Sequence, residues 1–286
     1  MTGRVLFPAL VLCLMAVLSG FSGVLANFLS LSPDQADLGQ RYLPASPAHI
    51  LGTDELGRDV FLRLLSGGRI SLTVGLVAAT LCTLTGTLIG LVAGWAGGRL
   101  DALLMRLTDI LISLPMLPLL IILSAIDLEE LGLPPDIAQS PGVSLCRIIL
   151  LISLMGWTGT ARLVRARTLA LKNADYVRAA AALGAGTGRI LARHILPNLM
   201  NTVTVAATLA AGNIILMESV LSFLGLGITP PMASWGNMLT RAADNIWGHA
   251  ALAVWPGVMI FVTVMAFNLL GDALQEEPGP KKPARA

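Results

Sequence analysis

Six apolar runs dominate this sequence, and each is long enough to cross a lipid bilayer. A helix needs about 20 apolar residues to span the hydrocarbon core. Hydrophobic residues make up 55% of the chain and charged residues 13%, against about 25% charged residues in a typical soluble domain. We therefore predict an all-α, polytopic membrane protein with six transmembrane helices, near residues 5–29, 70–96, 103–126, 143–163, 198–225 and 250–273.

The first run also has features of a signal peptide with a cleavage site after Ala26. It is longer than the usual apolar core of about 7–15 residues, and only Arg4 precedes it, which favours a retained membrane anchor. We divide the chain into an N-terminal helix with its outer segment, a five-helix core that includes a basic loop, and a tail whose composition predicts disorder. These parts are residues 1–69, 70–274 and 275–286.

The distribution of Lys and Arg predicts how the chain is oriented. With the N-terminus inside, the inner segments carry thirteen of the 19 basic residues and the outer segments carry six. Cytoplasmic loops are enriched in Lys and Arg. The bias therefore predicts that both termini lie in the cytoplasm.

The basic loop, residues 168–197, is the longest interruption of the apolar pattern. Asp175 is placed to cap a first helical turn. The alanine-rich segment Tyr176–Leu183 favours helix, and Gly184 suits the position just past a helix end. We predict a short helix in a loop that the charge bias places in the cytoplasm.

The same loop predicts a second helix that Thr187 opens, and Pro197 either closes it or begins the next span. Ala179–Ala182 leave almost no side chain on the first helix, so another protein can approach its backbone closely. A helical hairpin that merely joins two spans fits the same residues. Composition alone leaves both alternatives open.

The loop resembles the EAA loop of ABC-transporter permeases, with Pro197 thirteen residues after Gly184. In that family the loop sits in a cleft of the ATP-hydrolysing subunit. Arg178 replaces the Glu of the motif's name, and His194 stands where the motif usually has Ile. The resemblance implies contact with an ATPase through Tyr176, Arg178, Ala179, Ala180, Gly184, Leu196 and Pro197.

Residues 51–72, LGTDELGRDVFLRLLSGGRISL, predict an amphipathic helix that lies in the membrane interface. We expect two ion pairs at i,i+4 spacing on its wetter side, Asp54–Arg58 and Asp59–Arg63. This string is also similar to a signature of the permeases that serve dipeptide, oligopeptide and nickel importers.

Two features of the core predict local geometry. Gly86, Gly90 and Gly94 recur every four residues, and such a row of small residues lets another helix pack closely. Pro115 and Pro118 are expected to kink the third span.

Four charged residues remain as candidates for function. Arg106 and Asp109 are expected to pair at i,i+3 spacing, with Asp101 nearby. The family resemblance implies that Asp101, Arg106 and Asp109 lie in a lesser contact with the ATPase. Glu218 is an isolated acid in the fifth span, and such an acid must face protein or a wet cavity. It lines the transport route, pairs with a partner subunit, or is structural.

The sequence lacks the motifs of several enzyme classes. It has no G-x-x-x-x-G-K-[ST] phosphate loop, no G-x-S-x-G elbow and no H-E-x-x-H pair. Cys13, Cys82 and Cys146 are spaced for neither a metal site nor a disulfide framework. A secondary transporter should carry several ionisable groups at mid-membrane, and Glu218 stands alone. A non-catalytic, pore-forming subunit driven by a separate ATPase fits best.

The resemblance extends from about residue 51 to 274 and implies the permease fold of type I ABC importers. It implies no cofactor bound by this chain, with ATP and Mg used by two ATP-binding partner subunits. The other implied partners are a homologous second permease subunit, an extracytoplasmic substrate-binding protein and the lipid of a bacterial inner membrane, with no nucleic acid. Dipeptides or oligopeptides are the favoured cargo. Nickel or a metal chelate is the alternative, and an ion-gradient-driven secondary transporter is the alternative of a different class.

Overall fold

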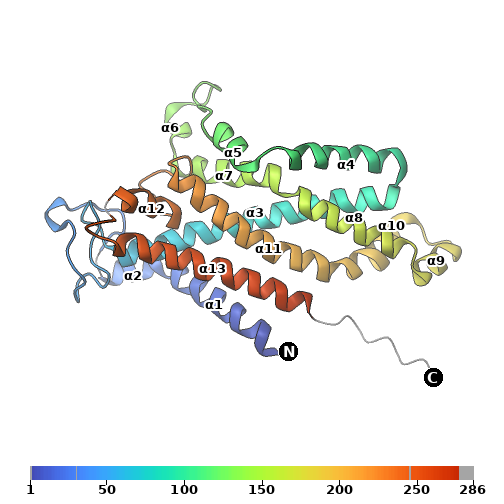
Figure 1. The fold of residues 1–286 in the computed structure, drawn as a ribbon, viewed down its shortest axis with the longest axis horizontal. Coiled ribbons are helices and arrows are strands. Elements are labelled where there is room, and N and C mark those ends of the chain that lie inside the picture. Colours follow the sequence, from blue (N-terminus) through green and yellow to red (C-terminus); the bar gives the residue numbers. More distant parts are fainter. Residues whose placement is uncertain (1, 30, 245, 277–286) are drawn as a thin grey trace.

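The computed structural model describes residues 2–29, 31–244 and 246–276, and Figure 1 shows an elongated bundle of helices. Nearly all of the tail predicted to be disordered, residues 275–286, lies outside the described residues. The helices of the described chain are α1 (Thr2–Gly20), α2 (Ser22–Leu29), α3 (Val60–Ala96), α4 (Gly98–Ser113), α5 (Met116–Ser124), α6 (Pro135–Ala138), α7 (Pro141–Gly156), α8 (Thr158–Lys172), α9 (Asp175–Ala182), α10 (Thr187–Ile190), α11 (Leu196–Phe223), α12 (Trp235–Asp244) and α13 (Ala251–Gln275), with a 3-10 turn at Leu38–Gln40 and a π turn at Leu191–Ile195.

The prediction of six spans agrees with the lengths and composition of these helices. Four continuous helical stretches are long and apolar enough to cross a membrane: Gly3–Gly20, Val60–Ala96, Thr187–Phe223 and Ala251–Gln275. The pairs α4–α5 and α7–α8 bring the total to six if each bent pair forms one span. The chain is therefore an all-α, polytopic protein.

The bend between α4 and α5 is 81° and lies at Leu114 and Pro115. Pro115 favours an extended conformation at the residue before it, and Leu114 has ψ of 134°. The predicted kink is confirmed at Pro115, whereas Pro118 is accommodated inside the first turn of α5. A smaller bend of 40° separates α7 from α8.

The expectation of a separate interfacial helix over residues 51–72 is wrong. Residues 51–59 form a compact loop, and α3 begins at Val60 and continues unbroken to Ala96. Asp59 caps α3, because its Oδ1 accepts a hydrogen bond from the Leu62 backbone N–H at 2.8 Å. The boundary expected between residues 69 and 70 therefore falls inside a single helix.

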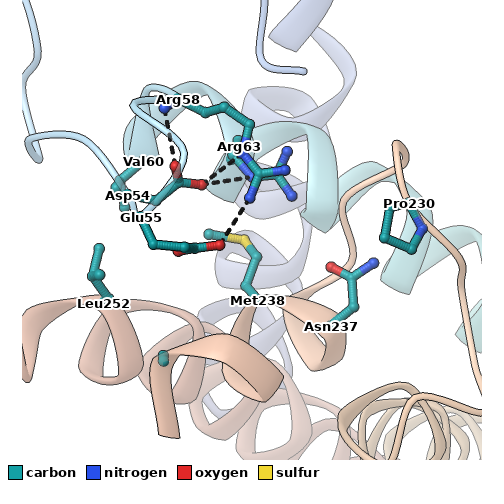
Figure 2. A pocket seen from close by; sticks show the side chains of 10 residues that line it. Asp54, Glu55, Arg58, Val60, Arg63, Pro230, Asn237, Met238 and Leu252 are labelled. Carbon is teal, nitrogen blue, oxygen red and sulfur yellow. Dashed lines mark hydrogen bonds and ion pairs between the residues drawn. The ribbon is translucent and has the colours of Figure 1, made fainter. Parts of the chain in front are cut away.

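Ion pairs between buried side chains hold this loop against the N-terminal end of α3 (Figure 2). The predicted pair Asp54–Arg58 forms, with Arg58 Nε 2.8 Å from Asp54 Oδ2, but both side chains are about nine-tenths buried in the loop rather than on a wet helix face. The predicted pair Asp59–Arg63 does not form. Arg63 contacts Asp34 and Asp54 instead, while Asp59 accepts a hydrogen bond from His49.

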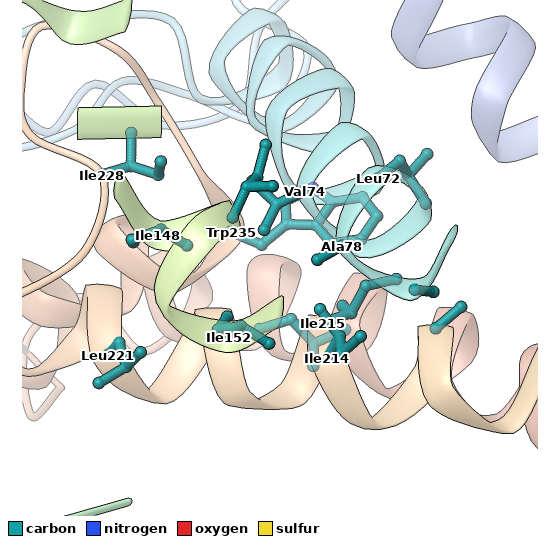
Figure 3. Close-up of a cluster of buried hydrophobic side chains, with 14 of the residues drawn as sticks. Leu72, Val74, Ala78, Ile148, Ile152, Ile214, Ile215, Leu221, Ile228 and Trp235 are labelled. Atoms are coloured by element: carbon teal, nitrogen blue, oxygen red, sulfur yellow. The ribbon is translucent and has the colours of Figure 1, made fainter. Parts of the chain in front are cut away.

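Trp235, the first residue of α12, lies at the centre of the main apolar core (Figure 3). Its side chain is fully buried, and its indole N–H donates to the Leu64 carbonyl at 2.9 Å. The neighbouring side chains come from α3, α7 and α11, among them Val74, Ala78, Ile148, Ile152, Ile214, Ile215 and Leu221.

The row of small residues on α3 packs against α8, as its spacing predicts. A Cβ added at Gly86 would lie 2.6 Å from the Trp157 carbonyl oxygen. A Cβ added at Gly90 would lie 2.4 Å from the Ala161 carbonyl oxygen. At these two positions a larger residue would force the two helix backbones apart.

Candidate functional site

The helix α9 protrudes at one end of the bundle, between α8 and α10 (Figure 1). Its last turn closes with two hydrogen bonds of 3.0 Å, from Gly184 N–H to the Ala181 carbonyl and from Ala185 N–H to the Ala180 carbonyl. Gly184 has φ of +83°. This is the Schellman arrangement, in which glycine takes the left-handed position past the helix end, and it confirms the prediction for Gly184.

The start of α9 differs from the prediction in one detail. Ala174 occupies the capping position, without a side-chain hydrogen bond, and Asp175 is the first helical residue. The carboxylate of Asp175 still lies in the first turn, where a negative charge is favourable. Thr187 begins α10 as predicted, after Gly186 at the capping position.

One side chain anchors α9 to the bundle. Val177 is 2% exposed and packs in a small apolar cluster with Val164 of α8, Ile195 of the π turn and Leu199 of α11. This cluster, which also contains Ile190, is separate from the main core. The cluster joins α9 to α8 and, through the π turn, to α11, so a displacement of α9 is expected to act on both helices.

The rest of α9 is open to solvent, and four of its eight residues, Ala179–Ala182, carry only a methyl side chain. Arg178, Ala179 and Gly184 are exposed, Ala180 is half-buried, and the Tyr176 side chain is 44% exposed. Leu183 is 90% exposed at the tip of the helix. Leu183 was not among the residues expected from the sequence, although it was the one large apolar side chain beside the alanine run.

The second half of the loop returns close to α9. The rings of Tyr176 and His194 lie 6.4 Å apart. Leu196 N–H donates to the Leu191 carbonyl, which closes the π turn. Pro197 follows in the first turn of α11, where it has no N–H to donate to the carbonyl four residues earlier. Pro197 thus does not end the loop helix, because the helical stretch Thr187–Phe223 continues through it into the fifth span. Leu196 and Pro197 lie on the same end of the bundle as α9.

The charged residues of α4 pair with α8 rather than with one another. Arg165 Nη2 lies 2.6 Å from Asp101 Oδ2, and Arg162 forms an ion pair with Asp109. The expected Arg106–Asp109 pair is wrong, and Arg106 has no ion pair within the described residues. Asp101 and Asp109 therefore tie α4 to the helix that carries α9.

Glu218 is fully buried inside the chain. Its carboxylate accepts hydrogen bonds from Ser71 Oγ at 3.0 Å and from Ser222 Oγ at 2.7 Å. Ser71 Oγ also accepts a hydrogen bond from the backbone N–H of Trp235. The hydrogen bonds around Glu218 therefore connect α3, α11 and α12. The structure does not bring Glu218 together with α9 or with the α4 carboxylates.

A different set of residues faces an open groove between α5, the α7–α8 bend and α11. The groove has a volume of about 370 Å³. Thr160 of α8 and Asn213 of α11 supply polar groups among apolar neighbours, which include Met116, Met155 and Met217. The two long helices that share the apolar cluster with Val177, α8 and α11, therefore also form walls of this groove.

Comparison with known proteins identifies relatives over almost the whole chain. The model of the family described as "Binding-protein-dependent transport system inner membrane component" matches residues 86–277. The dipeptide transport system permease protein DppC of Bacillus subtilis is 41% identical over 96% of this chain and 80% of its own length. The oligopeptide transport system permease protein OppC of the same organism is 39% identical over 83% of this chain and 73% of its own. The glutathione transport system permease protein GsiD of Pectobacterium atrosepticum is 39% identical over 82% of this chain and 74% of its own length. The chain therefore belongs to the family of inner-membrane components of binding-protein-dependent transport systems.

Proposed function

We propose that this chain is the membrane-spanning subunit of an ATP-driven importer of short peptides, and that α9 is the element held by the ATPase. The observation that carries the proposal is the form of α9: an exposed, alanine-rich helix whose one buried side chain, Val177, shares an apolar cluster with two helices that line a groove. The names of the relatives, which include dipeptide and oligopeptide permeases, support peptides as the cargo.

The proposed mechanism follows the contacts from α9 inward. Closure of two ATP-binding subunits displaces α9, and Val177 transmits the displacement to Val164 and Leu199. The helices α8 and α11 then shift the walls of the groove at Thr160 and Asn213. The close packing of Gly86 and Gly90 makes α3 follow α8. The groove forms one half of a path whose other half comes from a homologous second permease subunit.

We assign Glu218 a structural role in this mechanism rather than a place on the path. Its carboxylate is enclosed by its own subunit and satisfied by two serines, so a path between two subunits would not reach it. Asp101 and Asp109 act by holding α4 on α8, and Arg106 is left exposed at the same end of the bundle.

The proposed orientation places the α9 end in the cytoplasm, with both termini, in agreement with the bias of basic residues. The opposite end then faces a substrate-binding protein that delivers the cargo. The chain itself catalyses no reaction in this proposal, and ATP and Mg are used by the partner subunits. Import of nickel or a metal chelate is the alternative within the same machinery. Among the residues that the structure describes, no three His, Cys, Asp or Glu side chains gather as metal ligands would.

Substitution at Gly184 tests the role of α9. Valine at Gly184 is strained because of its φ of +83°, whereas Gly186 has an ordinary φ of −68° and open space around it. We expect Gly184→Val to displace the end of α9. In vesicles that contain the assembled transporter, uptake of a labelled dipeptide should be abolished while ATP hydrolysis continues. Gly186→Val serves as the matched control and should retain uptake. Full uptake by Gly184→Val would refute the proposal.

The same vesicles decide the cargo and the energy source. Uptake of labelled dipeptide should require ATP and survive an ionophore, and uptake of nickel should be absent. Uptake that follows an ion gradient would establish a secondary transporter instead.

A further inference from the structure

A wide groove lies beside α2, at the end of the bundle opposite α9. Its volume is about 890 Å³. One wall is formed by small residues of the first two helices, including Gly20, Ser22 and Gly23. The other wall is the first part of α3, where Arg69 and Thr73 face the groove.

Arg69 is a cation without a carboxylate partner among the residues that the structure describes. It is exposed, and its guanidinium takes part in no ion pair with the described chain. The groove also contains Asp34, but this carboxylate is engaged by Arg63 at 3.2 Å. The charge of Arg69 is thus left to attract an anion from outside the chain.

The position of Arg69 along the membrane normal narrows the choice of anion. Arg69 lies nine residues, about 14 Å, inside the start of α3, which is about 55 Å long. A ~30 Å hydrocarbon core centred on that helix begins at this depth, so Arg69 lies beside the lipid headgroups. Thr73, Leu76 and Thr80 follow at helical spacing on the same exposed face. The rise from Arg69 to Thr80 is about 16 Å, roughly half of a ~30 Å hydrocarbon core.

On this face of α3, Arg69 therefore lies beside the lipid headgroups, and the exposed residues that follow it extend across about one leaflet of the bilayer. Leu76 is 49% exposed, and Val24 on the α2 wall is 63% exposed. Leu76 lies one turn beyond Thr73, outside the groove, while Val24, Ile70 and Leu145 are apolar residues of its lining. These residues are suited to acyl chains, and arginine is suited to phosphate.

We propose that this groove binds one anionic phospholipid, with its phosphate on Arg69 and its acyl chains along Thr73 and Leu76. A zwitterionic phospholipid should bind less well, because its own ammonium group competes for the phosphate. The proposal is independent of the cargo and of the role of α9.

The test measures how much lipid the purified full-length chain retains in detergent, by native mass spectrometry, after mixing with dioleoyl phosphatidylglycerol or dioleoyl phosphatidylcholine. We expect one retained phosphatidylglycerol and little phosphatidylcholine. Arg69→Gln should lower retention roughly tenfold, the change expected from the loss of a hydrogen bond to a charged group. Arg41→Gln, an exposed arginine outside the groove, should leave retention unchanged.

A second variant fills the groove without disturbing the protein. A Cβ added at Gly23 meets nothing within 4 Å, so Gly23→Leu places its side chain in the space assigned to lipid. We expect it to reduce retention of phosphatidylglycerol. Gly257→Leu, at a helical glycine with equally open surroundings outside the groove, is the control for added bulk.

Two further measurements test whether the anion is a phospholipid or free phosphate, and whether lipid or protein occupies the groove. Inorganic phosphate alone should not raise the midpoint of thermal unfolding, whereas phosphatidylglycerol should raise it only when Arg69 is present. Equal retention by wild type, Arg69→Gln and Gly23→Leu would overturn the proposal. A disulfide or cross-link between Gly23→Cys and the second permease subunit in the assembled transporter would also overturn it, because the groove would then be a protein interface.

Discussion

Replacing Gly90 by alanine tests whether α3 and α8 move as one unit. The new Cβ would lie 2.4 Å from the Ala161 carbonyl oxygen and 2.9 Å from Val164 Cβ. An ordinary contact begins near 3.4 Å, so the two helices must separate by about 1 Å. The obstacle is largely backbone, which cannot rotate away as a flexible side chain does.

The magnitude follows from two opposing terms. Overpacking of this kind costs typically about 1–3 kcal/mol, while alanine in place of glycine within a helix contributes up to ~1 kcal/mol in the other direction. Taking the middle of the overpacking range, about 2 kcal/mol, and subtracting up to ~1 kcal/mol for the helix propensity of alanine leaves a destabilisation of about 1–2 kcal/mol. For a chain of this size that lowers the midpoint of thermal unfolding by roughly 2–8 °C.

The assay is thermal unfolding of the purified protein in detergent, together with dipeptide uptake into vesicles. Gly257→Ala is the matched control, because its added Cβ meets nothing within 4 Å and it also lies within a helix. Its midpoint should stay constant or rise. If Gly90→Ala unfolds at the same temperature as Gly257→Ala, the close packing of α3 on α8 contributes no rigidity and the reasoning is wrong.

Three further substitutions test the α9 site. Leu183→Ala removes a side chain that is 90% exposed, so the thermal midpoint should not change while uptake per ATP hydrolysed falls. Leu88→Ala, 62% exposed in the middle of α3, should affect neither. Val177→Ala removes the buried anchor of α9 and should cost about 1.6 kcal/mol, at ~0.8 kcal/mol for each buried carbon lost, whereas Val24→Ala, 63% exposed, should cost nothing measurable by thermal unfolding. Asp101→Asn removes the ion pair with Arg165 and should destabilise the chain by up to ~1 kcal/mol. Arg106→Gln, the control, should leave the midpoint of thermal unfolding unaltered. An equal effect of both variants would contradict the role of Asp101 in holding α4 on α8.

The features that the sequence predicts well depend on local patterns. The lengths of the apolar runs give the spans, Gly184 ends α9, and Gly86, Gly90 and Gly94 mark a helix contact. Each of these depends on residues within a few turns of one helix.

The features that were wrong depend on contacts between distant segments. The charges of residues 51–59 satisfy i,i+4 spacing in a helix and also fit a loop, and only the fold selects the loop. Gly57 has φ of +73° and approaches the Asp37 carbonyl so closely that no Cβ fits. Similarly, Asp109 is paired by Arg162, 53 residues away, rather than by Arg106 on its own helix. Leu183 was missed because α9 has only eight residues, too few for periodicity to identify its open face.

The unbroken course of α3 has a consequence for communication across the membrane. Its 37 residues make a rod about 55 Å long, which exceeds the ~40–45 Å thickness of a bilayer with its headgroups. The single helix α3 thus reaches from the loop of residues 51–59, at one end of the bundle, to α8 near α9 at the other end. Coupling free energies are reciprocal. In the importer proposed above, a substrate-binding protein docked on that loop should therefore change the nucleotide affinity of the ATPase by the same factor as nucleotide changes the docking affinity of the substrate-binding protein.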